Sequence, residues 1–101
     1  MIVLHATFQI KPDKLSEAVD LIEDLVEQSN EEDGMIEYRA ATDVQDENTI
    51  RFFEQYEDQE AFEAHSQTDH FQAFEAELPE LLAGKPEVHR FDVESATELE
   101  L

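Results

Sequence analysis

The chain has 101 residues, no cysteine and a formal net charge of −21, with 27 acidic side chains against 6 lysines and arginines. This length fits a single domain, and the lack of cysteine excludes disulfides, thiolate catalysis and sulfur-bound zinc. Nucleic acid and anionic membranes are poor partners because their negative charge would repel the protein. Hydrophobic residues still make up 41% of the chain, so a folded core is expected.

The acidic residues are spread over the faces of the expected helices rather than gathered in one tail. They indicate a solvated surface, because a dedicated acidic binding patch would require clustering. Such a surface repels itself at low ionic strength, whereas at molar salt the Debye length falls to about 3 Å. It therefore suits the salt-rich cytoplasm of a halophile.

No signal-peptide pattern opens the chain and no apolar run approaches the roughly 18 residues of a membrane span, so we expect a soluble, cytoplasmic protein without a membrane partner.

The N-terminal third predicts a strand followed by a helix. Apolar and polar residues alternate over residues 2–10, which predicts a strand with His5 on its more polar face. Pro12 fits the start of a helix, and apolar residues then recur at three- and four-residue steps over about residues 13–32. Gly34 is expected to stop this helix or to form the turn after it.

The middle of the chain predicts a β-hairpin. Two strand-like runs lie between Met35 and Glu57, separated by the polar turn Gln45–Asn48. Phe52 and Tyr56 fall on one face of the second run, and Phe53 falls on the other. Apolar residues on both faces indicate that both sides of the sheet are covered.

Helical spacing returns at Asp58 and continues as a second helical piece, for which Thr68 fits the N-cap position. Pro79 is expected to kink or restart that piece. A last strand is predicted over residues 87–93, with His89 on the same face as the aromatic side chain two positions later.

The order strand, helix, strand, strand, helix, strand is that of the split βαβ, or ferredoxin-like, α+β fold. It predicts a four-stranded antiparallel sheet with the helices on one face. Apolar residues on the other face would be exposed in a monomer, and such a patch usually marks an interface. We therefore expect one domain over residues 1–94, a C-terminal tail over residues 95–101, and a homodimer formed by two sheets packed face to face.

The segment FFEQYEDQEAFEAHSQTDHFQAF resembles the signature of the antibiotic biosynthesis monooxygenase domain family. That pattern joins an acidic-x-aromatic strand end, an acidic helix start and the run His-x-x-Thr-x-His-Phe. The matching positions are Glu54, Tyr56, Phe62, His65, Thr68, His70 and Phe71. The similarity extends over residues 2–94, although many members carry Trp where this chain has Tyr56. The resemblance implies a dimeric α+β barrel with a pocket between the helices and the sheet of each subunit.

The resemblance also implies a class of reaction. Several members oxygenate a small aromatic compound without metal or flavin, because the deprotonated phenol passes an electron directly to O₂. We therefore expect a cofactor-independent monooxygenase of a small quinol or phenol. Two alternatives stay open: a non-catalytic dimeric module that binds a small molecule, and an isomerase of a small phosphorylated sugar, whose pocket would need cations. The haem-degrading branch is disfavoured because its first-strand Asn and its helix Trp are absent.

His65 and His70 are the candidate catalytic residues, since the imidazole pKa of about 6.5 suits proton transfer near neutral pH. Each has an alternative interpretation as a packed or helix-terminal histidine.

The candidate substrate-binding residues are His5, Phe52, Tyr56, Phe62, Phe71, Phe74 and His89. The aromatic ones are equally suited to a core, and His5 or His89 to a dimer interface. No metal is expected, because histidines five apart share no helical face unless the helix breaks between them, and no third ligand is evident.

Overall fold

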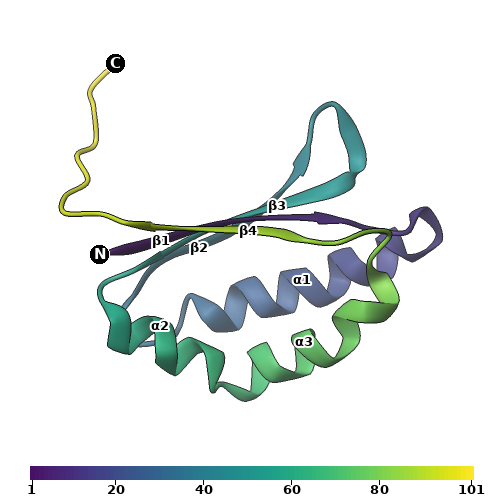
Figure 1. Cartoon of the computed structure of the whole chain (residues 1–101), viewed down its shortest axis with the longest axis horizontal. Helices are drawn as coiled ribbons and strands as arrows, with labels where there is room; N and C mark the ends of the chain where they lie inside the picture. Colours follow the sequence, from purple (N-terminus) through teal and green to yellow (C-terminus); the bar gives the residue numbers. More distant parts are fainter.

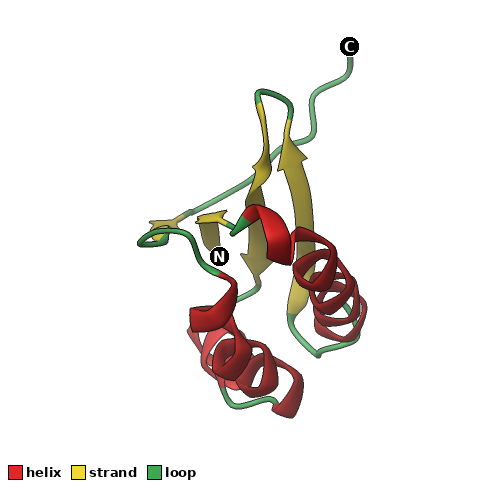
Figure 2. Ribbon diagram, turned by 90° about the vertical axis from the view of Figure 1, so that its right-hand side faces the viewer, coloured by secondary structure: helices red, strands yellow, loops and turns green.

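The computed structural model describes residues 1–101 as a four-stranded antiparallel sheet with every helix on one of its faces (Figures 1 and 2). The strands follow the order β2-β3-β1-β4 across the sheet. This arrangement is the predicted ferredoxin-like α+β fold, which is thereby confirmed. In chain order the elements are β1 (Ile2–Gln9), the 3₁₀ turn η1 (Pro12–Lys14), α1 (Leu15–Ser29), β2 (Met35–Asp43), β3 (Asp46–Tyr56), α2 (Gln59–Ser66), α3 (Asp69–Leu81) and β4 (Glu87–Asp92).

The main core lies between the inner face of the sheet and the helices α1 and α3. Ala6 and Phe8 of β1 lie directly opposite Phe52 and Ile50 of β3, and all four side chains are buried. The rings of Phe8 and Phe52 meet edge to face with centroids 5.2 Å apart. Each large apolar side chain buried here contributes roughly 1.5–3 kcal/mol of hydrophobic stabilisation. The buried residues that α1 and α3 add to this core are Ala18, Ile22, Leu25, Phe74 and Leu81.

Helix α1 ends earlier than the predicted residues 13–32, because the side chain of Asn30 joins its last turn to β2. The amide of Asn30 donates hydrogen bonds to the carbonyls of Val26 and Tyr38, each 2.9 Å long. Its Oδ1 accepts the backbone N–H of Tyr38 at 3.0 Å. One side chain thus adds a second hydrogen bond to a carbonyl at the helix end and anchors the chain to the strand. The turn that follows is completed by Gly34, whose φ of 81° favours glycine.

The turn between β2 and β3 is tighter than the predicted Gln45–Asn48 segment. It consists of Val44 and Gln45, and β3 already begins at Asp46. The carboxylate of Asp43 accepts the backbone N–H of Gln45 at 2.7 Å, which closes the turn locally. Asp46 and Glu47, which were expected in the loop, are therefore part of β3.

The predicted N-cap at Thr68 is confirmed, and the same residue also ends α2. Its hydroxyl accepts the backbone N–H of Phe71 at 3.2 Å and donates to the carbonyl of His65 at 2.8 Å. The helical layer is therefore broken between α2 and α3. Of the two expectations for Pro79, a kink or a restart, the restart is wrong, since α3 runs through it to Leu81. Pro79 lies in the last turn, where it removes only one backbone hydrogen bond.

The C-terminal segment extends away from the body of the protein (Figure 1). After β4, the backbone N–H of Val93 still donates to the carbonyl of Met1 at 2.8 Å. Residues 95–101 form no helix or strand. None of the helices combines the length and the apolar character that a bilayer crossing requires.

Candidate functional site

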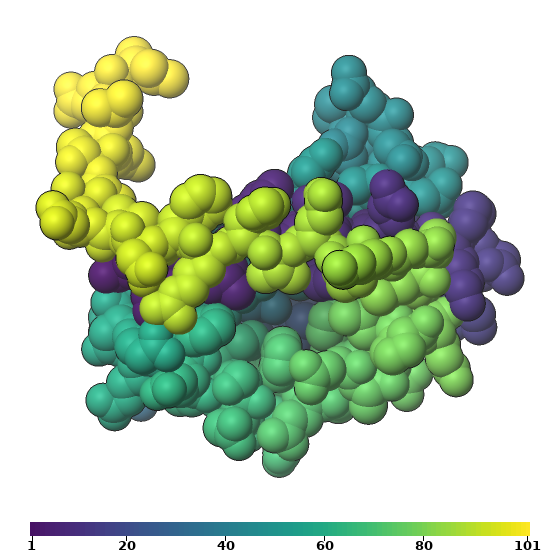
Figure 3. All heavy atoms as spheres, in the orientation of Figure 1, coloured from purple at the N-terminus to yellow at the C-terminus, as the bar shows by residue number.

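A cavity of about 260 Å³ lies between the inner face of the sheet and the layer formed by α2 and α3. In Figure 3 a hollow is visible between β4, in yellow-green, and these two helices below it. Most of the lining is apolar, and the small side chain of Ala6 leaves space beneath the helices. The polar exceptions in the lining are Glu54, Tyr56, His65, Ser66 and Glu75.

The structure brings together five of the residues predicted for the site. Tyr56, Phe62, His65, Phe71 and Phe74 all line this cavity.

Two other predicted site residues lie near the cavity without lining it. Phe52 is 1% exposed and packs edge-on against Phe8 and Tyr38, so it belongs to the core. His70 sits behind His65 and reaches the site only through a shared partner.

His5 and His89 do not approach this cavity, contrary to the prediction of pocket contacts. They lie opposite each other in the ladder between β1 and β4. His5 is also opposite Phe53, which is 40% exposed, so these three side chains share the face that the helices leave uncovered. Strand alternation alone could not tell which face the pocket occupies. The alternative role for both histidines, in a dimer interface, remains a prediction.

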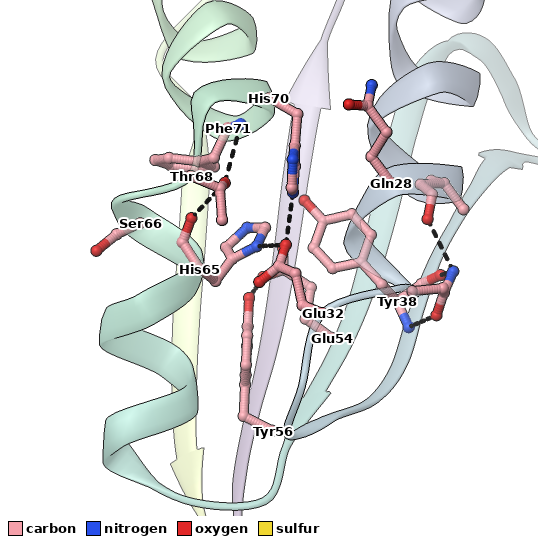
Figure 4. A network of polar contacts seen from close by, with 12 residues as sticks. Gln28, Glu32, Tyr38, Glu54, Tyr56, His65, Ser66, Thr68, His70 and Phe71 are labelled. Carbon is pink, nitrogen blue, oxygen red and sulfur yellow. Dashed lines mark hydrogen bonds and ion pairs between the residues drawn. The ribbon is translucent and has the colours of Figure 1, made fainter.

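Glu32 is the central site residue that the sequence did not reveal. Its Oε2 accepts hydrogen bonds from His65 Nδ1 at 2.8 Å and from His70 Nε2 at 2.6 Å (Figure 4). The exposed fractions of the three side chains are 12% for Glu32, 4% for His65 and 16% for His70. Glu32 lies in a run of consecutive acids before Gly34, and nothing in that run marks which carboxylate turns inward.

The contact with Glu32 determines which nitrogen of His65 is free. An ionised carboxylate can only accept hydrogen bonds, so His65 carries its proton on Nδ1 when the ring is neutral. Its Nε2 then has a lone pair, and this atom is buried without a hydrogen-bond partner. His65 lines the cavity and Glu32 does not, and Nε2 is the ring nitrogen that Glu32 leaves free.

The surroundings of His65 favour the neutral ring. Burial lowers the pKa of His65, and the hydrogen bond to Glu32 opposes that shift without cancelling it. Aromatic rings surround the imidazole, with centroid distances of 5.2 Å to Tyr38, 5.6 Å to Tyr56 and 4.9 Å to Phe71. A neutral imidazole in a largely water-free setting can act as a general base.

A second titratable group, Glu54, lines the same cavity. Tyr56 donates its hydroxyl proton to Glu54 Oε1 at 2.6 Å. Burial raises the pKa of Glu54 to about 7, although the bond from Tyr56 acts in the opposite direction. Burial also raises the pKa of Tyr56, so the phenol stays neutral and remains a donor. The sequence does carry a signal for Glu54, because it shares the inward face of β3 with Phe52 and Tyr56.

The two observations behind the expectation of no metal change in the structure. The helix does break between His65 and His70, at the Thr68 cap, which is the exception that the prediction allowed, and Glu32 is a candidate third ligand. One ligand atom from each of these three side chains lies within 4.8 Å of the others.

No lysine or arginine lines the cavity. Arg90 lies outside the lining, with its guanidinium over the ring of Phe62 at 5.4 Å, and it donates to Gln59 and Asp92. A phosphorylated substrate would therefore find no cationic partner inside. A wider, more open groove of about 450 Å³ between α1 and β2 contains Arg39 but no histidine.

The fold and the cavity together define a ferredoxin-like α+β domain with one sheet and a histidine-bearing aromatic cavity under its helices. The sequence profile of the family described as antibiotic biosynthesis monooxygenase matches residues 1–77. The chain is also similar to "Putative monooxygenase YcnE" of Bacillus subtilis, with 37% identity over 92% of this chain and 98% of the relative. The chain therefore belongs to the antibiotic biosynthesis monooxygenase family, as the resemblance predicted.

Solved structures share the fold of this chain. PA3566 from Pseudomonas aeruginosa is 26% identical and superposes with a TM-score of 0.85, covering 93% of this chain and 94% of that one. Rv0793 from Mycobacterium tuberculosis reaches a TM-score of 0.89 at 22% identity, with 96% and 98% covered. The second likeness shows the fold alone.

Proposed function

We propose that this protein is a cofactor-independent monooxygenase that oxidises a small, neutral phenol or quinol with O₂. The observation that carries the proposal is the unpartnered Nε2 of His65, which is buried at the edge of an aromatic cavity. Such an atom is a proton acceptor awaiting a donor, because a buried polar atom is rarely left without a partner.

The first step is removal of a proton. A phenolic hydroxyl in the cavity donates to His65 Nε2, and the proton moves to the ring. Glu32 holds Nδ1–H and stabilises the resulting imidazolium, as the carboxylate does beside the histidine of a hydrolase triad. His70 holds the same carboxylate oxygen from the other side. His65 is thus the base, and Glu32 and His70 are positioning residues.

The second step is oxidation of the phenolate by O₂. The electron-rich anion transfers an electron to O₂, the resulting pair combines at a ring carbon, and water is lost. A quinol and O₂ become a hydroxyquinone and water, so one oxygen atom enters the ring and the substrate supplies all four electrons. The apolar lining supports this step because it keeps water from the anion and from reduced oxygen.

Glu54 provides a contact for a second substrate oxygen. Tyr56 occupies Oε1 of Glu54, which leaves Oε2 for the substrate. When protonated, this carboxyl donates a hydrogen bond to a carbonyl or hydroxyl oxygen. When ionised, it places a negative charge beside the phenolate. Activity is therefore expected to fall as pH rises through about 7, the pKa of Glu54.

The cavity favours neutral substrates of limited size. Its volume of about 260 Å³ is slightly below the ~300 Å³ at which ligand pockets usually begin, which suits one or two fused rings. The sugar-phosphate isomerase is disfavoured, because it required two or more cations at the cavity and none lines it. The remaining alternative is a module that binds the same aromatic compounds without turnover.

We further propose that two copies pair through the uncovered sheet face. Phe53 and Phe91 are 40% and 52% exposed there. The charges on this face are nearly balanced despite the acidity of the chain, since Arg39 and Arg51 pair with nearby carboxylates. A second copy would cover the apolar groups without bringing many acids together.

The experiment is O₂ uptake by chelator-treated protein in molar KCl with a panel of reduced benzoquinones and naphthoquinones. The wild type should consume O₂, and Glu32→Gln should lose roughly tenfold or more in rate with little change in KM. Glu31→Gln is the matched control, because this neighbouring acid is exposed and outside the cluster. No uptake with any quinol, together with ligand-induced thermal stabilisation, would favour the binding module.

A further inference from the structure

We propose that Glu32, His65 and His70 form a binding site for one divalent first-row transition-metal ion of the zinc class, and that the bound ion blocks His65 as a base. The proposal that a metal ion binds rests only on the geometry of the three side chains. The block rests on the proposed function, because it concerns the nitrogen that would accept the substrate proton.

Three separate segments deliver the ligands. Glu32 comes from the turn after α1, His65 from the end of α2 and His70 from the start of α3. The nitrogen-to-oxygen distances are 2.8 and 2.6 Å. Metal bonds of about 2.0–2.2 Å place neighbouring ligands roughly 3.0–3.5 Å apart, so each nitrogen has to move by less than about 1 Å from Glu32 Oε2.

The donor set selects the class of ion. Two neutral imidazoles and one carboxylate suit Zn²⁺, Co²⁺, Ni²⁺ or Cu²⁺, whereas Mg²⁺ and Ca²⁺ prefer sites made wholly of oxygen. The site is enclosed but reachable, since Glu32 and His70 are 12% and 16% exposed while His65 is 4% exposed. An ion would approach from the side of Glu32 and His70, and not through the cavity.

The position of the ion determines its effect. Neither Glu32 nor His70 lines the cavity, so the ion would lie behind the imidazole of His65 and would not touch a substrate. It would bind Nδ1, which releases its proton, and a neutral ring then carries that proton on Nε2. Nε2 thus changes from acceptor to donor. No proton is gained or lost overall, because the same shift between nitrogens occurs in His70.

The test separates this site from diffuse binding to the acidic surface. The 101-residue protein is stripped with chelator and titrated with Co²⁺ in molar KCl and millimolar Mg²⁺. The Co²⁺ absorption bands are the readout, and dialysis against Zn²⁺ gives the stoichiometry. We expect one ion per chain, and binding weaker by roughly tenfold or more in Glu32→Gln and in His70→Ala. Glu31→Gln and His89→Ala are the controls, and both should bind as the wild type does.

The outcomes for binding and for inhibition are distinct. Unchanged affinity in folded Glu32→Gln and His70→Ala, or only non-saturating uptake of Co²⁺, would overturn the metal site. If Zn²⁺ saturates the site and O₂ uptake is not reduced at least tenfold, the block of His65 is wrong. Stoichiometric binding without O₂ uptake by the metal-free protein would instead reject the proposed oxygenase and leave the site standing.

Discussion

The two sides of the sheet carry similar residue types, which are enclosed on the side of the helices and uncovered on the other side. Histidine and phenylalanine occur on both sides of the sheet, yet His65, on α2 above the inner face, is buried and lacks a partner for Nε2. On the outer face, His5 and His89 lie side by side without cover. Residue type alone therefore does not make the site. Enclosure by α2 and α3, together with one inward carboxylate, does.

The acidic residues show the same contrast. Most of the 27 acids are solvated on the surface. Glu54 faces the cavity, and burial raises its pKa to about 7. Asp43, which is half-buried at the outer face, has a lowered pKa because Arg51 hydrogen-bonds to it. The inner face thus turns an abundant surface residue into a group that titrates near neutral pH.

The largest expected effect comes from removing the imidazole on the inner face and comparing it with one on the outer face. His65→Ala should lower kcat/KM for O₂ uptake by roughly 10²–10⁴, the usual contribution of a general base. His89→Ala should change it less than about twofold, since this side chain does not line the cavity. Equal losses in the two variants would show that the cavity is not where the reaction occurs.

Glu54→Gln should remove a pH-dependent loss of stability. The pKa of Glu54 rises from 4.5 to about 7 on folding, so the folded state binds the proton more tightly. Stability from this group is complete below pH 4.5 and is lost as pH rises through 7, by about 3 kcal/mol in total. Urea unfolding of the wild type and of Glu54→Gln across this pH range measures the contribution of Glu54 to the free energy of unfolding. A constant difference between them would contradict the burial of an ionisable Glu54.

Gly34→Ala should destabilise the turn that carries Glu32. An added Cβ would lie 2.7 Å from the Cβ of Ala61, and the φ of 81° is strained for any L side chain. We expect a loss of roughly 2–3 kcal/mol in the free energy of unfolding. Gly84→Ala is the matched control, because its Cβ would meet only the flexible end of Gln9 at 3.3 Å. Similar small losses in both variants would mean that the turn adapts.

Phe53→Glu on the outer face should affect assembly rather than folding. The side chain is 40% exposed, so the free energy of unfolding of a single chain should change by about 0.5 kcal/mol or less. If two sheets pair through this face, a buried charge should shift the protein from dimer to monomer in sedimentation at molar KCl. A wild-type protein that sediments as a monomer would remove the proposed pairing.

The sequence by itself determined the element order, the division of β3 into two faces and the Thr68 cap, because helical and strand periods and caps depend on neighbours along the chain. It also marked His65 as a histidine on an apolar helical face. Only the tertiary structure decided that α1 stops at Asn30 and that Glu32, among several adjacent acids, turns inward. The contacts of Glu32 join residues 33 and 38 positions apart, and no local pattern encodes such a pairing.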